Sequence, residues 1–406
     1  MPALLTFALL ATTFSAVPPV EFLGKALIDG GMTDRSGLRG LSAPAVPQNR
    51  FGGWGSAIDH RGPGDTYVVA CDRGAGDGIA SFKCRLHELT ITVHPGETDP
   101  VRWTIGKAIL LTNEKGANLL GTANMIDADH PADSLRFDPE GVRIMADGTF
   151  LVSDEYGPFI DQFNASGQRV RRMPVPARFR CAAPKPTPQE EQAANTSGRQ
   201  SNRGFEGLAL TPSGNRLVAL LQSPLIQDGG VDAKGRRIGI NIRALSFDTA
   251  SGKSTEFVYQ LKGPADGVSE ILALDQTRFL VLERDGKSGH KADHRSLYLI
   301  DTAAATDISA ILALPQFDLP PTIKPVTKTE LIDFLDPAFT LAGTGMPEKI
   351  EGLAFGPDLP DGRKLLIVTV DNDFKLDVPN EIWAFAITPA ALAPSATPAA
   401  PATNSP

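Results

Sequence analysis

The stretch FDPEGVRI at residues 137–144, followed by DGTFLVSDEYG at residues 147–157, is the unit from which the fold of this chain can be inferred. A glutamate stands ahead of a short apolar run, and a turn then leads to a second run that ends in polar residues. The same plan recurs in GFEGLAL at 204–210, GVSEILAL at 267–274 and KIEGLAF at 349–355. A fifth, degenerate copy is GLRGLSA at 37–43, with Arg39 in the place of the glutamate. Such internal repetition points to a repeat architecture.

Each repeat contains short apolar runs divided by Gly, Asp and Asn turns, which favours an antiparallel four-stranded meander over a helical repeat. Radial repetition of such meanders makes a β-propeller, and a two-sheet sandwich, the rival fold, does not need five copies of one motif. We therefore predict an all-β chain with a single β-propeller of five or six antiparallel four-stranded blades over residues 20–388. The segment 20–29 should complete the last blade beside residues 381–387, which would remove an exposed sheet edge.

The two termini differ from the repeats in composition. Residues 1–16, MPALLTFALLATTFSA, resemble a secretory signal peptide, with a buried first strand as the alternative. Residues 389–406 are rich in Pro and Ala, and we expect a disordered tail there. These features predict a periplasmic or secreted monomer with no membrane span. The net charge of −8, without a basic stripe, argues against a nucleic-acid partner.

The three cysteines, Cys71, Cys84 and Cys181, are an odd number, so at least one thiol must be free or pair outside the chain. In an exported protein, Cys71 at the end of one strand and Cys84 at the start of the next could form a disulfide across a hairpin. Cys181 could replace either of them. The alternative is three ordinary small residues.

The repeats also predict where a functional site would lie. In a propeller the first strand of each blade lines the central channel, and the second strand returns to the same face. The starts of the first strands and the ends of the second strands therefore meet at one mouth, where the long insertions 175–202, 224–241 and 285–295 also open. A glutamate before glycine can alternatively bond to the neighbouring blade and mark a bulge.

We assign the polar residues at this mouth to three roles. Several carboxylates around one axis suit a divalent cation, calcium in the first instance, and basic side chains beside them suit an anionic ester. A carboxylate at the end of the second strand in the repeat at 137–157 could act as general base. The candidate metal ligands are Glu140, Glu206, Glu270, Glu351 and Asp371, the candidate substrate-binding residues are Arg73, Arg203, Arg284 and Lys349, and the candidate catalytic residues are Asp154 and Glu155.

The segments FDPEGVRIMADGTFLVSDEYGPFI, NRGFEGLAL, FLVLERDG and KIEGLAFGPDLPDGRKLLIVTVDNDF together resemble the phytase-like, or esterase-like, propeller family of exported bacterial proteins. The resemblance extends over roughly residues 37–387, and it implies a β-propeller that hydrolyses an ester or phosphate ester. It does not identify catalytic residues, and the metal-ligand pattern of the calcium-dependent propeller phytases is not reproduced. We thus expect an exported hydrolase of a small anionic ester, preferably a phosphate ester. The alternatives are a non-catalytic propeller that binds a ligand or protein, and a lactonase-like metal hydrolase.

Overall fold

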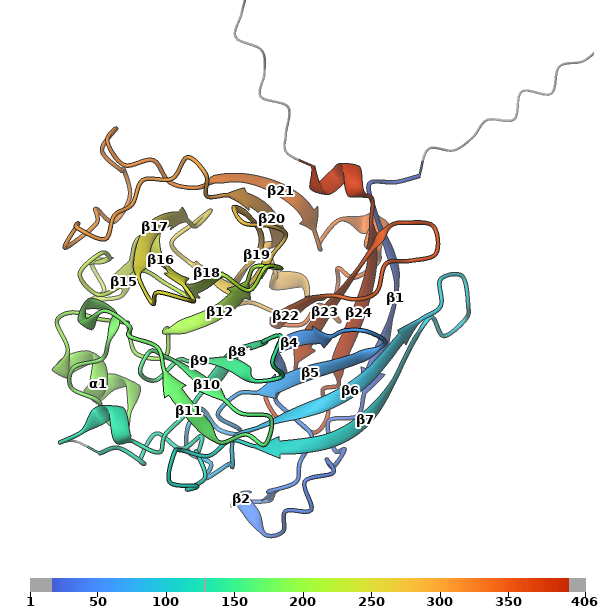
Figure 1. Ribbon diagram of the computed structural model, residues 1–406, viewed down its shortest axis with the longest axis horizontal. Coiled ribbons are helices and arrows are strands. Elements are labelled where there is room, and N and C mark those ends of the chain that lie inside the picture. Colours follow the sequence, from blue (N-terminus) through green and yellow to red (C-terminus); the bar gives the residue numbers. More distant parts are fainter. Residues whose placement is uncertain (1–16, 128, 394–406) are drawn as a thin grey trace, which may run out of the picture.

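The computed structural model describes residues 17–127 and 129–393, so the expected signal peptide at 1–16 and most of the expected tail lie outside the described residues. Within the described ranges the chain forms a β-propeller of five antiparallel four-stranded blades (Figure 1). The prediction of an all-β propeller is confirmed, and of the two blade numbers it allowed, five is the one observed. Among these residues, no helix is long and apolar enough to cross a membrane.

Each blade begins with its inner strand and proceeds outward. Blade 1 contains β4 (Trp54–Arg61), β5 (Thr66–Cys71), β6 (Arg85–Val93) and β7 (Val101–Leu110), and blade 2 contains β8 (Pro139–Ile144), β9 (Phe150–Asp154), β10 (Phe159–Phe163) and β11 (Arg169–Arg172). Blade 3 contains β12 (Phe205–Leu210), β13 (Arg216–Leu221), β16 (Asn241–Asp248) and β17 (Ser254–Gln260). Blade 4 contains β18 (Asp266–Ala273), β19 (Arg278–Asp285), β20 (Arg295–Asp301) and β21 (Thr327–Asp333).

Blade 5 joins the two ends of the propeller domain. Its strands β22 (Lys349–Phe355), β23 (Lys364–Asp371) and β24 (Asn380–Ile387) come from the C-terminal side, and β1 (Val20–Ile28) from the N-terminal side is its outer strand. The pairing of β1 with β24 runs from Val20 opposite Ile387 to Ile28 opposite Asn380, as the sequence predicted. Closure is completed at the axis, where each inner strand contacts the next and β22 contacts β4. The hydrophobic core is accordingly divided into clusters between neighbouring blades.

The prediction that residues 37–43 form the inner strand of the first repeat was wrong. In GLRGLSA, residues Leu41–Ala43 form β2, which pairs with β3 (Val46–Pro47) in a small hairpin outside the five blades. Arg39 is exposed there and is not part of an inner strand. The inner strand of blade 1 is β4, WGSAIDHR, which has no glutamate and so does not show the motif.

A bulge at the start of each inner strand decides which side chains face the mouth. The pairing with the second strand shifts around Glu140, Glu206, Ser269 and Glu351, and β4 has a comparable shift between Trp54 and Ala57. The bulged residue in blade 4 is therefore Ser269, and Glu270 occupies the position of the motif glycines. Because a shift of one residue in a strand reverses the direction of the side chain, Glu270 differs from the other three glutamates. The prediction that a glutamate before glycine marks a bulge thus holds at three blades.

The thiols do not form the expected disulfide: Cys71, Cys84 and Cys181, all within the described ranges, are free and buried. Cys71 packs in the cluster between blades 5 and 1, whereas Cys84 packs in the cluster between blades 1 and 2. The two sulfur atoms thus lie on opposite faces of the same blade, which explains why the prediction was wrong. Burial raises the pKa of both of these thiols well above the usual value, which makes them unreactive.

The helical segments outside the blades are short. The insertion between blades 2 and 3 contains η2 (Ala177–Phe179) and α1 (Pro188–Ala194), for which Thr187 is the N-cap. At the C-terminal end, Pro389–Leu392 form η5 with Leu392 buried, so part of the segment expected to be disordered is folded against the propeller. Residues 394–406 of that tail lie outside the described residues.

Candidate functional site

A cavity of about 410 Å³ opens at the mouth of the propeller and contains eight of the eleven residues predicted for the site. These eight are Glu140, Glu155, Glu206, Glu351, Arg73, Arg203, Arg284 and Lys349. They come from blades 1 to 5 and from the connection before β12, so residues far apart in sequence meet at one place. The cavity wall also includes Ser269, Gln222, Asn202, Asp77, Glu348 and Asp373.

The three bulged glutamates differ in their partners. Glu206 Oε1 accepts a hydrogen bond of 2.7 Å from Gln222 Nε2, and Glu351 Oε1 accepts one of 2.8 Å from Arg284 Nη2. The Oε2 atoms of both residues are buried and have no hydrogen-bond partner among the described residues. The carboxylate of Glu140 forms neither a hydrogen bond nor an ion pair with any other described residue. Carboxylate oxygens are therefore left available at the bottom of the cavity.

The charges around the cavity change the acidity of these groups. Burial, and after it the charges of Asp138 and Glu206, raise the pKa of Glu140 well above the usual value. Burial, and after it the charges of Glu155 and Glu351, do the same for the pKa of Glu206. Carboxyl groups with raised pKa values in a cavity can hold a proton near neutral pH and can transfer it.

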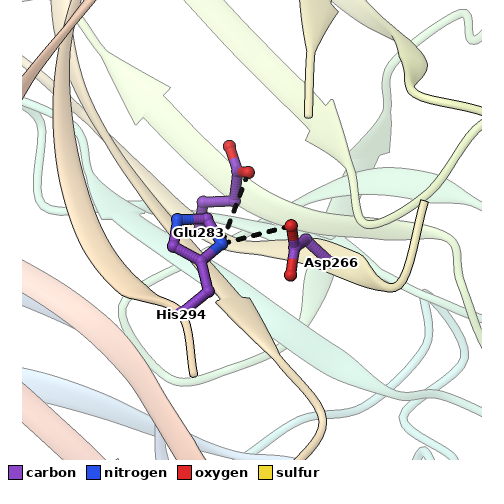
Figure 2. Close-up of side chains that lie close together, drawn as sticks. All are labelled: Asp266, Glu283 and His294. Carbon is purple, nitrogen blue, oxygen red and sulfur yellow. Dashed lines mark ion pairs between the residues drawn. The ribbon is translucent and has the colours of Figure 1, made fainter. Parts of the chain in front are cut away.

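Three clusters of potential metal ligands occur in residues 17–127 and 129–393, with ligand atoms within 4.8 Å of one another in each. One contains Asp138, Glu140 and Glu155, the second contains Asp72, Asp371 and Asp373, and the third contains Asp266, Glu283 and His294. The third lies within blade 4 (Figure 2). The five metal ligands predicted from the sequence do not form one cluster, because Glu140 and Asp371 belong to separate ones.

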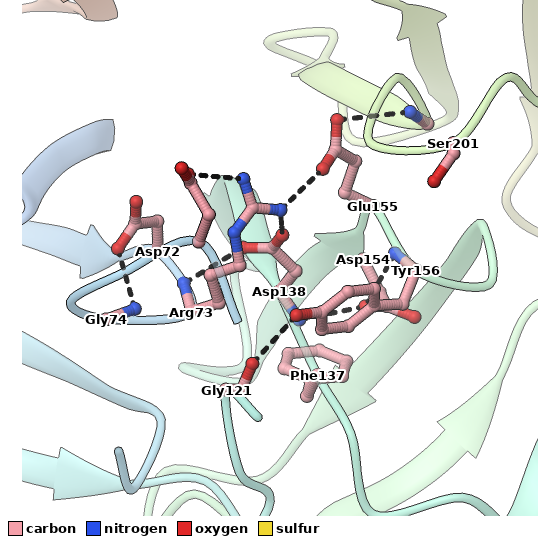
Figure 3. A network of polar contacts seen from close by, with 12 residues as sticks. Asp72, Arg73, Gly74, Gly121, Phe137, Asp138, Asp154, Glu155, Tyr156 and Ser201 are labelled. Atoms are coloured by element: carbon pink, nitrogen blue, oxygen red, sulfur yellow. Dashed lines mark hydrogen bonds and ion pairs between the residues drawn. The ribbon is translucent and has the colours of Figure 1, made fainter. Parts of the chain in front are cut away.

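Each of the first two clusters already has a cationic side chain of the protein between its carboxylates, and in the third Lys328 pairs with Glu283. Arg73 Nη1 pairs with Asp138 and, at 3.0 Å, with Glu155, and the guanidinium lies between these carboxylates in Figure 3. Glu155 Oε1 also accepts a hydrogen bond of 3.3 Å from the Gly204 backbone, which fixes its orientation. In the second cluster, Lys349 Nζ lies 2.6 Å from Asp373, 3.5 Å from Asp371 and 3.6 Å from Asp72.

Two further basic residues face the cavity with different surroundings. Arg284 donates to Ser269 Oγ at 2.9 Å and to Glu351, so it joins the bulges of blades 4 and 5. Arg203 is exposed and donates to Ser223 Oγ at 3.1 Å and Gln222 Oε1 at 3.4 Å. Arg203 has no carboxylate partner within the part of the chain that the structure describes, so its charge is available to an anionic ligand.

Three predicted residues do not line this cavity. Asp154 accepts hydrogen bonds from the backbone of Asp138, Tyr156 and Gly157 at 2.9, 3.2 and 3.0 Å, and thus holds the turn after β9. Asp371 is buried behind Lys349 and accepts from the Asp373 backbone at 2.8 Å.

The third of these residues, Glu270, lies between neighbouring inner strands. Its carboxylate pairs with Arg143 at 3.0 Å and accepts hydrogen bonds from the backbone of Leu208 and Ile271. Arg143 in turn donates to the carbonyl groups of Ile58 and Ile271, each at 2.9 Å, and so links blades 1, 2 and 4 near the axis.

Sequence reasoning missed several residues of the site. Ser269 was overlooked because the alignment of GVSEILAL was placed one residue too far along, at the more conspicuous Glu270. Asp138 stands two residues before Glu140 in FDPEG, so its polar character before the strand was a usable signal. Asn202 has a side chain common in any loop, and the sequence does not set it apart, whereas Gln222 was expected at the mouth because it follows a second strand.

One curated relative, described as an uncharacterized secreted protein of Arthroderma benhamiae, is 31% identical over 189 residues. This match covers 39% of the chain and 36% of the relative, so the chain spans about a third of that protein's length.

Solved structures with similar shape are more distant. A luciferin-regenerating enzyme matches with a TM-score of 0.33 and 10% identity over 90% of this chain and 97% of its own. The propeller domain of Cps50 (Swd1) from Myceliophteria thermophila matches with a TM-score of 0.36 and 13% identity, over 84% and 98%. Scores this low support no inference about function. The family model described as phytase-like, esterase-like activity of phytase, matches residues 49–374, and the chain therefore belongs to this phytase-like family.

Proposed function

We propose that the cavity at the propeller mouth hydrolyses a small anionic ester, with a phosphate ester preferred. The observation that supports it most is the combination of glutamates with free oxygens at the bottom and basic side chains at the rim, above all Arg203. The description of the family as esterase-like supports hydrolysis. The secreted relative supports export, which we include in the proposal.

Anion binding in this proposal rests on Arg203 and Arg284. Guanidinium groups bind phosphate oxygens with paired hydrogen bonds, and they keep their charge at any physiological pH. Arg203 approaches from the insertion and Arg284 from the end of β19, so the anion would lie between blades 3 and 4. Lys349 adds positive charge from blade 5, although three aspartates share it.

Proton transfer rests on two glutamates whose surroundings differ. Glu155 is held by Arg73 at 3.0 Å and by the Gly204 backbone at 3.3 Å, which orients its carboxylate as a general base that activates water. Glu206 has a raised pKa and a free Oε2, which suits a general acid that protonates the leaving alkoxide. A pair of carboxyl groups, one acting as base and the other as acid, is a recurrent arrangement in hydrolytic enzymes. The candidate role of Asp154 becomes a structural one in this scheme, because backbone amides occupy its oxygens.

The roles proposed for these residues do not depend on a metal ion. The predicted calcium would need the oxygens of Glu140, Glu206 and Glu351 in one coordination shell, and these do not form a cluster among the described residues. A cation at the Glu140 cluster would have to compete with Arg73. Metal assistance therefore remains a prediction for a chelator experiment.

The test is a hydrolysis assay with the purified chain on a panel of a phosphate monoester, a phosphodiester, a carboxylic ester and a lactone. We expect the phosphate monoester to be turned over fastest, and Arg203→Met to raise KM for it. The matched control is Arg171→Met, which removes an exposed arginine on the outer strand β11. Absence of turnover on every member of the panel would favour the non-catalytic binding propeller. Preference for the lactone together with loss of activity in chelator would favour the lactonase-like alternative.

A further inference from the structure

The third cluster of potential metal ligands lies in blade 4, apart from the glutamates of the cavity. Asp266 begins β18, Glu283 lies near the end of β19, and His294 immediately precedes β20. His294 Nδ1 is 3.2 Å from Asp266 Oδ2 and 3.7 Å from Glu283 Oε1 (Figure 2). Three consecutive strands of one blade thus bring an imidazole nitrogen and two carboxylates together.

The imidazole ring of His294 is held in one orientation. Its Nε2 lies 3.0 Å from the hydroxyl group of Tyr298, on the side of the ring away from the carboxylates. The backbone amides of Asp293 and His294 donate to Asp285 Oδ2 at 2.9 and 3.2 Å, and Asp285 is paired with Arg295. The turn before β20 is therefore fixed, and Nδ1 is the ring atom that points into the cluster.

His294 Nδ1 has no hydrogen-bond partner among the described residues, although the residue is only 5% exposed. The carboxylate oxygens surround this nitrogen at short distance but do not lie in line for a hydrogen bond to it. The ligand atoms of a tetrahedral ion are also close together without hydrogen bonds between them, because each points at the ion and not at its neighbours. With bonds of 2.0 to 2.1 Å, tetrahedral ligand atoms are about 3.3 Å apart, close to the two distances observed.

The charges of the cluster also suit a cation. Glu283 Oε2 accepts hydrogen bonds from the Tyr259 hydroxyl and from Lys328, and its Oε1 faces His294 and accepts from the Lys262 backbone at 2.7 Å. Lys328 thus compensates one carboxylate and leaves the other, Asp266, without a basic partner except His294 among the described residues. With a neutral imidazole the cluster retains negative charge.

We propose that Asp266, Glu283 and His294 bind a divalent transition-metal ion, zinc in the first instance. A nitrogen ligand with two carboxylates favours zinc over calcium or magnesium, which prefer ligand sets made of oxygen alone. Asp266 also lines a cavity of about 580 Å³ beside the mouth, so water from this cavity can supply a fourth ligand. The ion would tie the starts of β18 and β20 to the end of β19. The site is independent of the hydrolysis proposed above.

The experiment uses the full chain, first treated with chelator and then titrated with zinc chloride or calcium chloride alone. We expect one zinc ion per chain by elemental analysis, a higher melting temperature with zinc because the ion binds only the folded state, and little effect of calcium. Cobalt substitution should give the visible absorption of a tetrahedral site. Asp266→Asn keeps the size of the side chain and should weaken zinc affinity by at least about 10-fold.

The control is His290→Ala, which removes an exposed histidine in the same loop and should leave zinc binding unchanged. His294→Ala should abolish binding, and its melting temperature without metal shows whether it folds. The proposal is overturned if wild-type protein retains no zinc. It is also overturned if Asp266→Asn binds zinc as tightly as the wild type, or if His290→Ala loses the ion.

Discussion

Replacing Arg284 by methionine should destabilise the folded protein through the glutamate that it leaves behind. The guanidinium donates to Glu351 at 2.8 Å, and the side chains are 10% and 5% exposed. Removing one partner of a buried ion pair costs about 3–5 kcal/mol, because the other charge stays buried without compensation. The pair borders the cavity, so we expect the lower end, about 3 kcal/mol. For a chain of this size that loss lowers the melting temperature by about 4 °C.

A double-mutant cycle measured by urea unfolding separates the pair from other effects. Arg284→Met with Glu351→Gln removes both charges, so most of the lost stability should return, and the cycle should give a coupling of about 1–3 kcal/mol. Arg102→Met is the control, since Arg102 pairs with Glu97 on the surface and such pairs contribute at most about 1 kcal/mol. The reasoning fails if Arg284→Met costs no more than Arg102→Met, or if the double variant is as unstable as the sum of its single variants.

Three other predictions concern the ring. The pKa of Glu140 is raised in the folded state, so the contribution of this residue to stability is complete below its unfolded pKa and is lost as pH rises through its folded pKa. In thermal melts between pH 4 and pH 9, the melting temperature of Glu140→Gln should therefore decline less steeply with pH than that of the wild type. An unchanged slope would contradict this. Gly207→Ala should lower the free energy of unfolding in urea by about 1–3 kcal/mol, because its Cβ would lie 2.6 Å from the backbone of β18. Gly286→Ala, with open space around its Cβ, should lower it much less. Equal losses would contradict tight packing of the inner strands. Deletion of β1 should expose the edge of β24 and produce oligomers or aggregates in size-exclusion chromatography, and a deletion variant that elutes like the full chain would show that closure by β1 is dispensable.

The repeated motif was sufficient to predict the propeller and its closure by β1, because both depend on patterns that extend along whole strands. It was not sufficient to find the inner strand of blade 1. β4 forms that strand from WGSAIDHR, with glycine and serine at the bulge, and it packs against β22 and β8 without a motif glutamate. The apparent copy at Arg39 matched only in its glycines and leucines.

The limits of the site prediction have a similar cause. Glu140, Glu206 and Glu351 were placed correctly at the mouth, because each precedes a glycine that packs against the next strand. In blade 4 the bulge lies one residue earlier, and this shift turns Glu270 towards Arg143. Sequence alone does not reveal such a shift.

The pairing of cations with carboxylates was also beyond the sequence. Arg73 and Lys349 were expected to hold substrate, and the structure shows that aspartates and glutamates from other blades surround them. These contacts join residues that are distant in the chain, so no local sequence pattern predicts them.

The most direct test of the proposed hydrolysis is the kcat of Glu206→Gln on the phosphate ester that the wild type hydrolyses fastest, with Glu97→Gln as control. Glu97 is exposed in the turn between β6 and β7, outside the cavity lining, and its replacement removes the same charge. If Glu206 transfers a proton to the leaving group, Glu206→Gln should lower kcat by about 10²–10⁴-fold with little change in KM, and Glu97→Gln should match the wild type. A Glu206→Gln variant that keeps the wild-type kcat would contradict the assignment of this cavity as the hydrolytic site.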